Sequence, residues 1–151
     1  MTSRDDPARP PSSLAAHLRG GARGRPAAVL IVDPDIEGGR RLAAALAPRA
    51  VVVVGSARAA LEAIRVRMPD LIVVELTLPD MSGIEFIARV HDAPATRNVL
   101  LLVATQRGSV RDKIAAFQAG ADDYLVKPLD AQQFIAHVQL VSRFLQVLGR
   151  E

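Results

Sequence analysis

Four side chains that could do chemistry lie just after the ends of short apolar runs of the sequence. They are two carboxylates, a hydroxyl and an ammonium group: Asp33, Glu75, Thr105 and Lys127. In an open α/β sheet the site lies outside the carboxyl ends of the strands, so these four residues are expected to share one edge. The sequence therefore predicts an acidic site there with one cation beside it.

The apolar runs themselves have the length and composition of buried strands. Four of them are continuous stretches of aliphatic residues and a fifth is weaker: Val29–Val32, Val51–Val54, Leu71–Val74, Val99–Val103 and Tyr124–Val126. Runs of this kind are typical of parallel strands that are buried on both faces. We therefore expect a parallel sheet covered by helices on both sides.

Amphipathic helical patterns separate the runs, and three of them begin at a residue that can cap a helix. Ser82, Ser109 and Asp130 supply the capping oxygens, and Gly120 predicts the end of the second of these helices. That second helix carries one apolar stripe, made by Val110, Ile114 and Phe117. Alternating strands and helices predict a doubly wound α/β fold with a five-stranded parallel sheet.

Composition narrows the class of protein further. The 151 residues suit one domain with a proper core. The chain has no Cys, which excludes disulfides and thiolate metal sites and favours a cytoplasmic location. No apolar run approaches the ~20 residues of a membrane span. The three His residues, His17, His91 and His137, have no metal-ligand spacing.

The charge is confined to the first part of the chain. Residues 1–26 contain five Arg against two Asp, which accounts for the whole formal charge of +3. The neutral remainder argues against direct binding of nucleic acid. Residues 1–26 are rich in Arg, Pro and Gly and are predicted to form a flexible leader before a domain at 27–151. The alternative is that the leader's apolar patch, Leu14–Leu18, has a bound role.

Two longer motifs reveal a resemblance to a known family. The runs PDLIVVELTLPDMSG (69–83) and GADDYLVKP (120–128) resemble the receiver domain of two-component response regulators. The similarity extends from about residue 27 to residue 148. It implies a flavodoxin-like strand order 2-1-3-4-5. It also implies a site where Mg²⁺ and an Asp at the end of the third strand accept a phosphoryl group from a histidine kinase.

The resemblance can be carried over residue by residue. Lys127 and Thr105 match the family's Lys and hydroxyl positions, which hold phosphoryl oxygens, and Lys127 precedes a Pro as in the family. Tyr124 matches the aromatic residue that swings inward when that hydroxyl moves to a bound phosphoryl group. Asp33 matches one residue of the family's acidic pair.

Two positions depart from the family's pattern. Glu75 stands where the phosphoacceptor Asp is expected, and its extra methylene moves the carboxylate by roughly 1.5 Å. Pro34 stands where the second acidic residue is expected and brings no metal ligand. Asp35 could fold back toward the pocket or cap the following helix. We expect no cofactor and at most weak Mg²⁺ binding at Asp33 and Glu75.

The last helix carries more apolar residues than one sheet-covering stripe requires. The surplus residues are Ile135, Leu140, Phe144 and Val147. Receivers commonly dimerise or dock partners through this side of the fold, so we expect a protein partner or a homodimer here. The alternative is that the leader folds back over this surface.

These observations predict a stand-alone, atypical receiver (a pseudo-receiver) that signals through protein contacts and is neither phosphorylated nor an enzyme. Glu75 with Lys127 is either a mimic of the phosphorylated state or a structural ion pair, and the sequence leaves both open. One alternative is an ordinary receiver seen as an acceptor-site Asp-to-Glu variant. Another is a small-ligand-binding module that uses the same cleft.

Overall fold

The computed structural model describes residues 28–149, and side chains up to Arg143. The predicted leader, residues 1–26, lies outside this range. Within it the strands are β1 (Ala28–Val32), β2 (Ala50–Val54), β3 (Leu71–Val74), β4 (Leu100–Thr105) and β5 (Asp123–Val126). The helices are α2 (Ile36–Ala45), α3 (Ala57–Val66), α4 (Gly83–Asp92), α5 (Val110–Ala119) and α6 (Ala131–Gly149).

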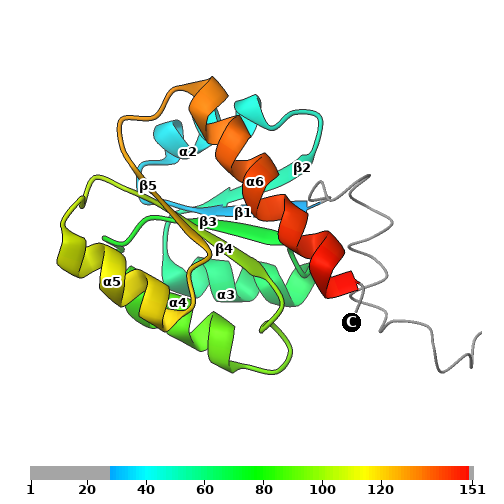
Figure 1. Cartoon of the computed structure of the whole chain (residues 1–151), viewed down its shortest axis with the longest axis vertical. Helices are drawn as coiled ribbons and strands as arrows, with labels where there is room; N and C mark the ends of the chain where they lie inside the picture. The colour runs from blue at the N-terminus through cyan, green and yellow to red at the C-terminus, as the bar shows by residue number, and fades with distance from the viewer. Residues whose placement is uncertain (1–27, 150–151) are drawn as a thin grey trace, which may run out of the picture.

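The strands form one parallel sheet in the order β2-β1-β3-β4-β5, which confirms the predicted doubly wound fold. Helices α2 and α6 cover one face, and α3, α4 and α5 cover the other (Figure 1). The order places β1 directly beside β3, with Val32 opposite Val74. The residues that follow these two strands, Asp33 and Glu75, therefore leave the sheet side by side.

Each face of the sheet has its own apolar core. Under α2 and α6 the core includes Phe134, Val138 and Val141 of α6. Under the other three helices it includes Phe86 and Ile87 of α4. Two such cores hold the sheet rigid from both sides, so the strand ends are fixed platforms for the polar residues.

The prediction that the strands are buried on both faces is correct for β1, β3 and β4 and wrong for the two edge strands, β2 and β5. In β5 only Leu125 is buried, and Val126 is 38% exposed. Every residue of β1, β3 and β4 is buried. Strand β2 lies at an edge of the sheet, and Val52 remains 52% exposed. A continuous apolar run does not reveal whether neighbours will cover it, because that depends on the strand order.

The predicted helix ends agree with the structure. Ser109 accepts a hydrogen bond from the amide of Asp112 (3.0 Å), and Asp130 accepts one from the amide of Gln133 (2.6 Å). Ser82 likewise accepts from the amide of Ile84. Gly120 ends α5 with φ of 128°, a conformation that side chains rarely adopt. The local capping chemistry was therefore readable from the sequence.

The apolar stripe of α5 faces solvent, although such a stripe would ordinarily pack on the sheet. Val110, Ile114 and Phe117 are 69%, 52% and 47% exposed, and Ala116 is the buried residue of α5. The helix packs through small residues and leaves its larger ones outside.

Among the helices of the described residues, none is long and apolar enough to cross a membrane.

Candidate functional site

Three of the four predicted residues meet in one ion-paired cluster at the carboxyl ends of the strands. Lys127 places its Nζ 2.6 Å from Oδ2 of Asp33 and 3.1 Å from Oε1 of Glu75. Both carboxylates are buried, and the Lys127 side chain is mostly buried. One ammonium group therefore bridges two buried carboxylates that follow adjacent strands.

The fourth predicted residue binds the other oxygen of Glu75. The hydroxyl of Thr105, which is fully buried at the end of β4, donates a hydrogen bond to Oε2 of Glu75. The backbone amide of Thr77 donates to the same oxygen at 3.1 Å. Both oxygens of Glu75 are thus held, one by a cation and one by two donors.

Electrostatics stabilise the charged form of Lys127. Burial alone lowers the pKa of this ammonium group, but the hydrogen bonds and charges of Asp33 and Glu75 outweigh it and hold the pKa above its usual value. The strand order creates this effect, because it puts two acidic positions within reach of one Lys. Lys127 is therefore charged at neutral pH.

Asp35 lies outside the cluster. Its carboxylate accepts from the amide of Gly38 at 3.0 Å and caps α2, which is the second of the two roles considered for it. Its own amide donates to Oδ1 of Asp33 at 2.9 Å. Both carboxylate oxygens of Asp33 are therefore bound, one by this amide and one by Lys127. Pro34, which lies between Asp33 and Asp35 in the sequence, has no side-chain oxygen that could bind a metal ion.

The donor set does not suit the Mg²⁺ ion that the family's pattern implies. Magnesium requires near-octahedral oxygen ligands placed tightly. Here Lys127 already binds both carboxylates, and Pro34 occupies the position of the second acidic residue. Among the residues that the structure describes, no three acidic or His side chains are grouped to hold a metal ion.

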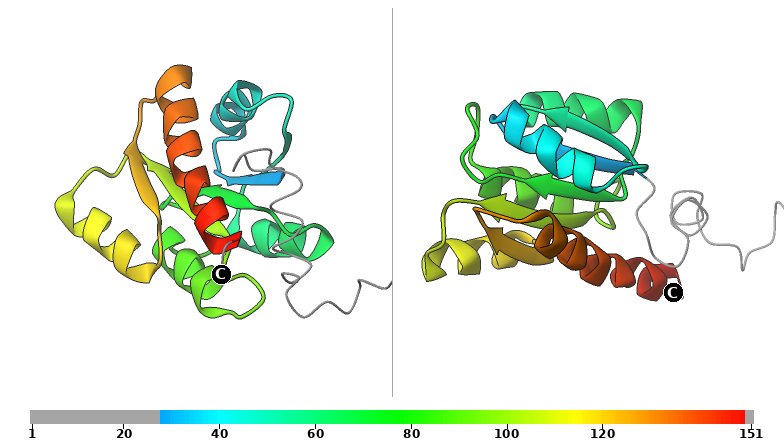
Figure 2. Two further views of the ribbon diagram at one scale, coloured as in Figure 1. Left: turned by 45° about the vertical axis from the view of Figure 1, so that its right-hand side comes forward. Right: turned by 90° about the horizontal axis from the view of Figure 1, so that it is seen from above.

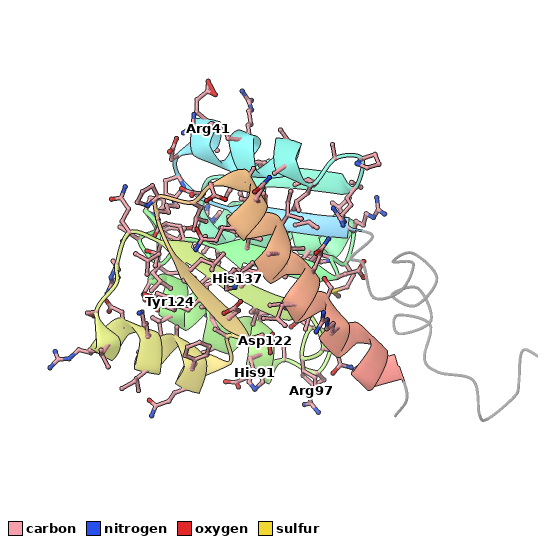
Figure 3. All side chains as sticks on the ribbon, turned by 45° about the horizontal axis from the view of Figure 1, so that its top comes forward. Arg41, His91, Arg97, Asp122, Tyr124 and His137 are labelled. Atoms are coloured by element: carbon pink, nitrogen blue, oxygen red, sulfur yellow. The ribbon has the colours of Figure 1, made fainter. Side chains whose placement is uncertain are left out.

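Tyr124 lies on β5, the strand that Lys127 directly follows (Figure 3). Its hydroxyl donates to the backbone carbonyl of Arg107, and its ring packs against the core under α5, with Phe117 6.3 Å away between ring centroids. Burial raises the pKa of the Tyr124 hydroxyl, and the negative charge of Asp112 adds to this. The ring is therefore held against the body of the protein.

An ion pair that the sequence analysis missed secures the segment between β4 and α5. The guanidinium of Arg107 contacts the carboxylate of Asp112 at 2.7 Å and 3.2 Å. The hydrogen bonds that Arg107 donates to Asp112 lower the pKa of Asp112 and raise the pKa of Arg107. The two residues are five positions apart in the sequence, a spacing that is typical of neither a helix face nor a strand face, so the pair was not predicted. It fixes the carbonyl that Tyr124 binds.

The structure describes the side chains of two of the four surplus apolar residues of α6. Leu140 is 51% exposed and Ile135 is partly buried. Phe144 and Val147 lie within the helix, but their side chains fall outside the described residues. The exposed stripe of α5 and Val126 of β5 add apolar surface that the sequence analysis did not assign to a partner.

Known proteins are similar to this chain in both sequence and fold. Residues 29–139 match the family described as the response regulator receiver domain. The transcriptional regulatory protein BasR of Escherichia coli is 38% identical over 117 residues, which is 76% of this chain and 52% of BasR. The chain spans about half the length of that relative, and 31% of the regulator RpaA of Synechocystis.

Solved structures agree with the fold. The chemotaxis response regulator CheY4 of Vibrio cholerae superposes with a TM-score of 0.72 at 27% identity, over 76% of this chain and 98% of CheY4. A CheY-like receiver domain protein from Methanospirillum hungatei gives a TM-score of 0.75 at 22% identity, over 81% of this chain and 98% of that one. With its strand order and its residue 29–139 match, the chain belongs to the response regulator receiver domain family of two-component signalling.

Proposed function

We propose that this protein is a pseudo-receiver, held in one signalling state by Glu75 and acting through contacts with other proteins. The observation that carries the proposal is the complete occupation of the Glu75 carboxylate. Lys127 binds Oε1, while Thr105 and the Thr77 amide bind Oε2. In a phosphate-accepting receiver, Lys and hydroxyl side chains at these positions hold the phosphoryl oxygens.

Glu75 therefore takes the place of the phosphorylated Asp in two respects. Its longer side chain brings negative oxygens forward to Lys127 and Thr105. Both oxygens of the Glu75 carboxylate are also hydrogen-bonded. An in-line attack needs a free carboxylate oxygen near the phosphoryl donor, so the carboxylate is poorly placed to act as a nucleophile. This favours a mimic of the phosphorylated state over a merely structural ion pair, the two interpretations that the sequence left open.

The position of Tyr124 supports the same proposal. In the family this aromatic residue moves inward once the hydroxyl residue bonds a phosphoryl group. Here the Thr105 hydroxyl is bonded to Glu75, and the Tyr124 ring packs on the core with its hydroxyl on Arg107. The two switch residues thus have the arrangement expected when the acceptor position carries extra negative oxygens.

The output in this proposal is a surface beside the switch. Apolar residues of α5, β5 and α6 are exposed there: Val110, Ile114, Phe117, Val126 and Leu140. We call these five residues the output face. Tyr124 contacts Phe117, so the state of the pocket is linked to this face through packed side chains. A protein partner or a second copy of the chain is the proposed occupant.

The test is phosphotransfer from a small phosphodonor in the presence of Mg²⁺, followed by intact-mass and peptide mapping. We expect no added phosphate on the natural chain. The double variant Pro34→Asp with Glu75→Asp restores the second acid and the shorter nucleophile, so it should become phosphorylated. A Mg²⁺-dependent phosphate on the natural chain, mapped to Glu75 or Asp33, would refute the proposal and leave an ordinary receiver.

The locked state has its own measurement. Tyr124 is the single Tyr and the chain has no Trp, so tyrosine fluorescence reports on this ring alone. Glu75→Ala releases the Thr105 hydroxyl and should change the emission and quenching of Tyr124. The exposed carboxylate of Glu85 provides a matched control, and Glu85→Ala should change neither. Equal spectra for Glu75→Ala and the natural chain would show that Glu75 is only a structural ion pair.

A further inference from the structure

An apolar groove opens at the sheet edge away from the output face. Its volume is about 270 Å³, and its walls come from β1, β2, α3 and the segment after α3. The lining includes Ala28, Val52, Ala63 and Val66, with Arg67 as its one charged residue. The groove arises because β2 is an edge strand and α3 presents the small Ala63 above it.

Two valine side chains at this groove are exposed to solvent. Val66 is 88% exposed and Val52 is half exposed, the latter on a strand of the sequence Ala-Val-Val-Val-Val. Natural proteins usually blunt or cover an apolar edge strand, since its free backbone groups can pair with another chain. Within the described residues nothing covers Val52 or Val66.

We propose that this groove seats the apolar patch of the protein's own N-terminal segment, Leu14–Leu18. Leu14 and Leu18 are four residues apart, so both would lie on one face of a helical turn, as in recognition of a helix by a groove. A volume of about 270 Å³ suits a few aliphatic side chains rather than a folded domain. This proposal is independent of the role of Glu75.

The connection between the segment and the groove is short. Ala28, the first described residue, is itself a groove wall. Residues 19–27 join it to Leu18, and nine extended residues reach at most about 30 Å. They are rich in Gly and Arg, with a single Pro, and so can turn back. Closing so short a loop costs little entropy, which gives the patch a high effective concentration at the groove.

The other exposed apolar surfaces are less suitable for this segment. The stripe of α5 lies at the opposite side of the molecule from the start of β1 in all three views (Figure 1, Figure 2). Its residues form a convex helix face, whereas the residues around Val52 and Val66 enclose a volume. The groove is therefore the nearer and the better shaped site.

Cysteine cross-linking in the full chain tests the proposal directly, because the natural sequence contains no Cys. Leu18→Cys is combined in turn with Val66→Cys in the groove, with Ala47→Cys near the start of β2, and with Ile114→Cys on α5. We expect the Val66 pair to form an intramolecular disulfide about tenfold faster than the Ala47 pair. Circular dichroism confirms that each variant folds.

A second substitution separates seating from mere proximity. Adding Leu14→Asp should remove the rate advantage of the Val66 pair, since a charge cannot enter the apolar groove without a partner. Equal rates for the Val66 and Ala47 pairs would overturn the proposal. So would faster reaction with Ile114→Cys, or a disulfide between two chains in place of the intramolecular one.

Discussion

Nζ of Lys127 lies 3.1 Å from Oε1 of Glu75, and this pair joins the end of β5 to the end of β3. Strands β3 and β5 are not neighbours, because β4 lies between them. The pair therefore closes the site across an intervening strand, and Thr105 at the end of that strand binds the other Glu75 oxygen.

Lys127→Met should destabilise the fold, because it leaves Asp33 and Glu75 as buried carboxylates without their cation. The expected loss is about 2 kcal/mol, below the about 3–5 kcal/mol of a fully buried pair, since the Lys127 side chain is 20% exposed. Urea denaturation measures it. Arg89→Met, which breaks the exposed pair with Glu85, is the control and should change the stability by less than about 0.5 kcal/mol.

The same variant has a predictable pH dependence. The folded state raises the pKa of Lys127, so its stabilising effect is complete below the unfolded Lys value of about 10.4 and is lost as the pH rises through the folded pKa. The difference between Lys127→Met and the natural chain should therefore persist at pH 7 and shrink above about pH 10.4. A constant difference across this range would contradict the assigned cause.

Magnesium should not bind saturably at millimolar concentration, since Lys127 competes for both carboxylates and Pro34 offers no side-chain oxygen. Broadening of NMR signals by Mn²⁺ is the measurement. Pro34→Asp with Glu75→Asp should show selective broadening around residue 33. Equal, selective broadening in the natural chain would mean that the cation displaces Lys127.

Association with a partner or a second copy should depend on the output face more than on the pocket. Leu140→Glu and Ile114→Glu each place a charge on a half-exposed apolar residue and should weaken association by about tenfold or more. Glu75→Ala acts only through Thr105 and Tyr124 and should have the smaller effect. Sedimentation at several concentrations, or capture with a candidate partner, compares the three variants. The reverse order would place function in the pocket itself.

Gly120→Ala should destabilise the protein by about 1–2 kcal/mol or more, because Gly120 has φ of 128° and a Cβ there would lie 2.5 Å from the His91 ring. His91→Ala in the same chain should relieve only the contact with the ring, because Cβ of residue 91 would still lie 2.6 Å from the added methyl group. Gly108→Ala is the control: its Cβ would meet Val126 at 3.4 Å, so its effect should stay within about 0.5 kcal/mol. Thermal unfolding of the natural chain and the three variants measures these effects.

Asp122→Asn should stabilise the protein at neutral pH. Burial is the main cause that raises the pKa of this carboxyl group, although the amide of Leu101 donates to it at 2.9 Å. A raised folded pKa means that stability is greatest below the unfolded value of about 3.9 and declines as the pH rises through the folded pKa. The gain from Asn should therefore vanish in acid. A gain that is independent of pH would point to packing instead.

Much of this protein could be predicted from local sequence alone. The caps at Ser109 and Asp130 and the stop at Gly120 were readable because a cap involves a few neighbouring residues. The doubly wound fold was readable because alternating apolar runs and helical patterns have few packed solutions. The four strand-end residues could be predicted to share one edge for the same reason.

Tertiary structure alone decided the rest. The strand order places Val52 on an edge strand. Helix α5 packs on the protein through Ala116, so Ile114 and Phe117 face solvent although their spacing is typical of a stripe that packs on a sheet. The contacts of Lys127 with Asp33 and Glu75 depend on distances between residues far apart in the chain. Local spacing carries no information on such distances, because they are set by the packing of the whole sheet between its two helical layers.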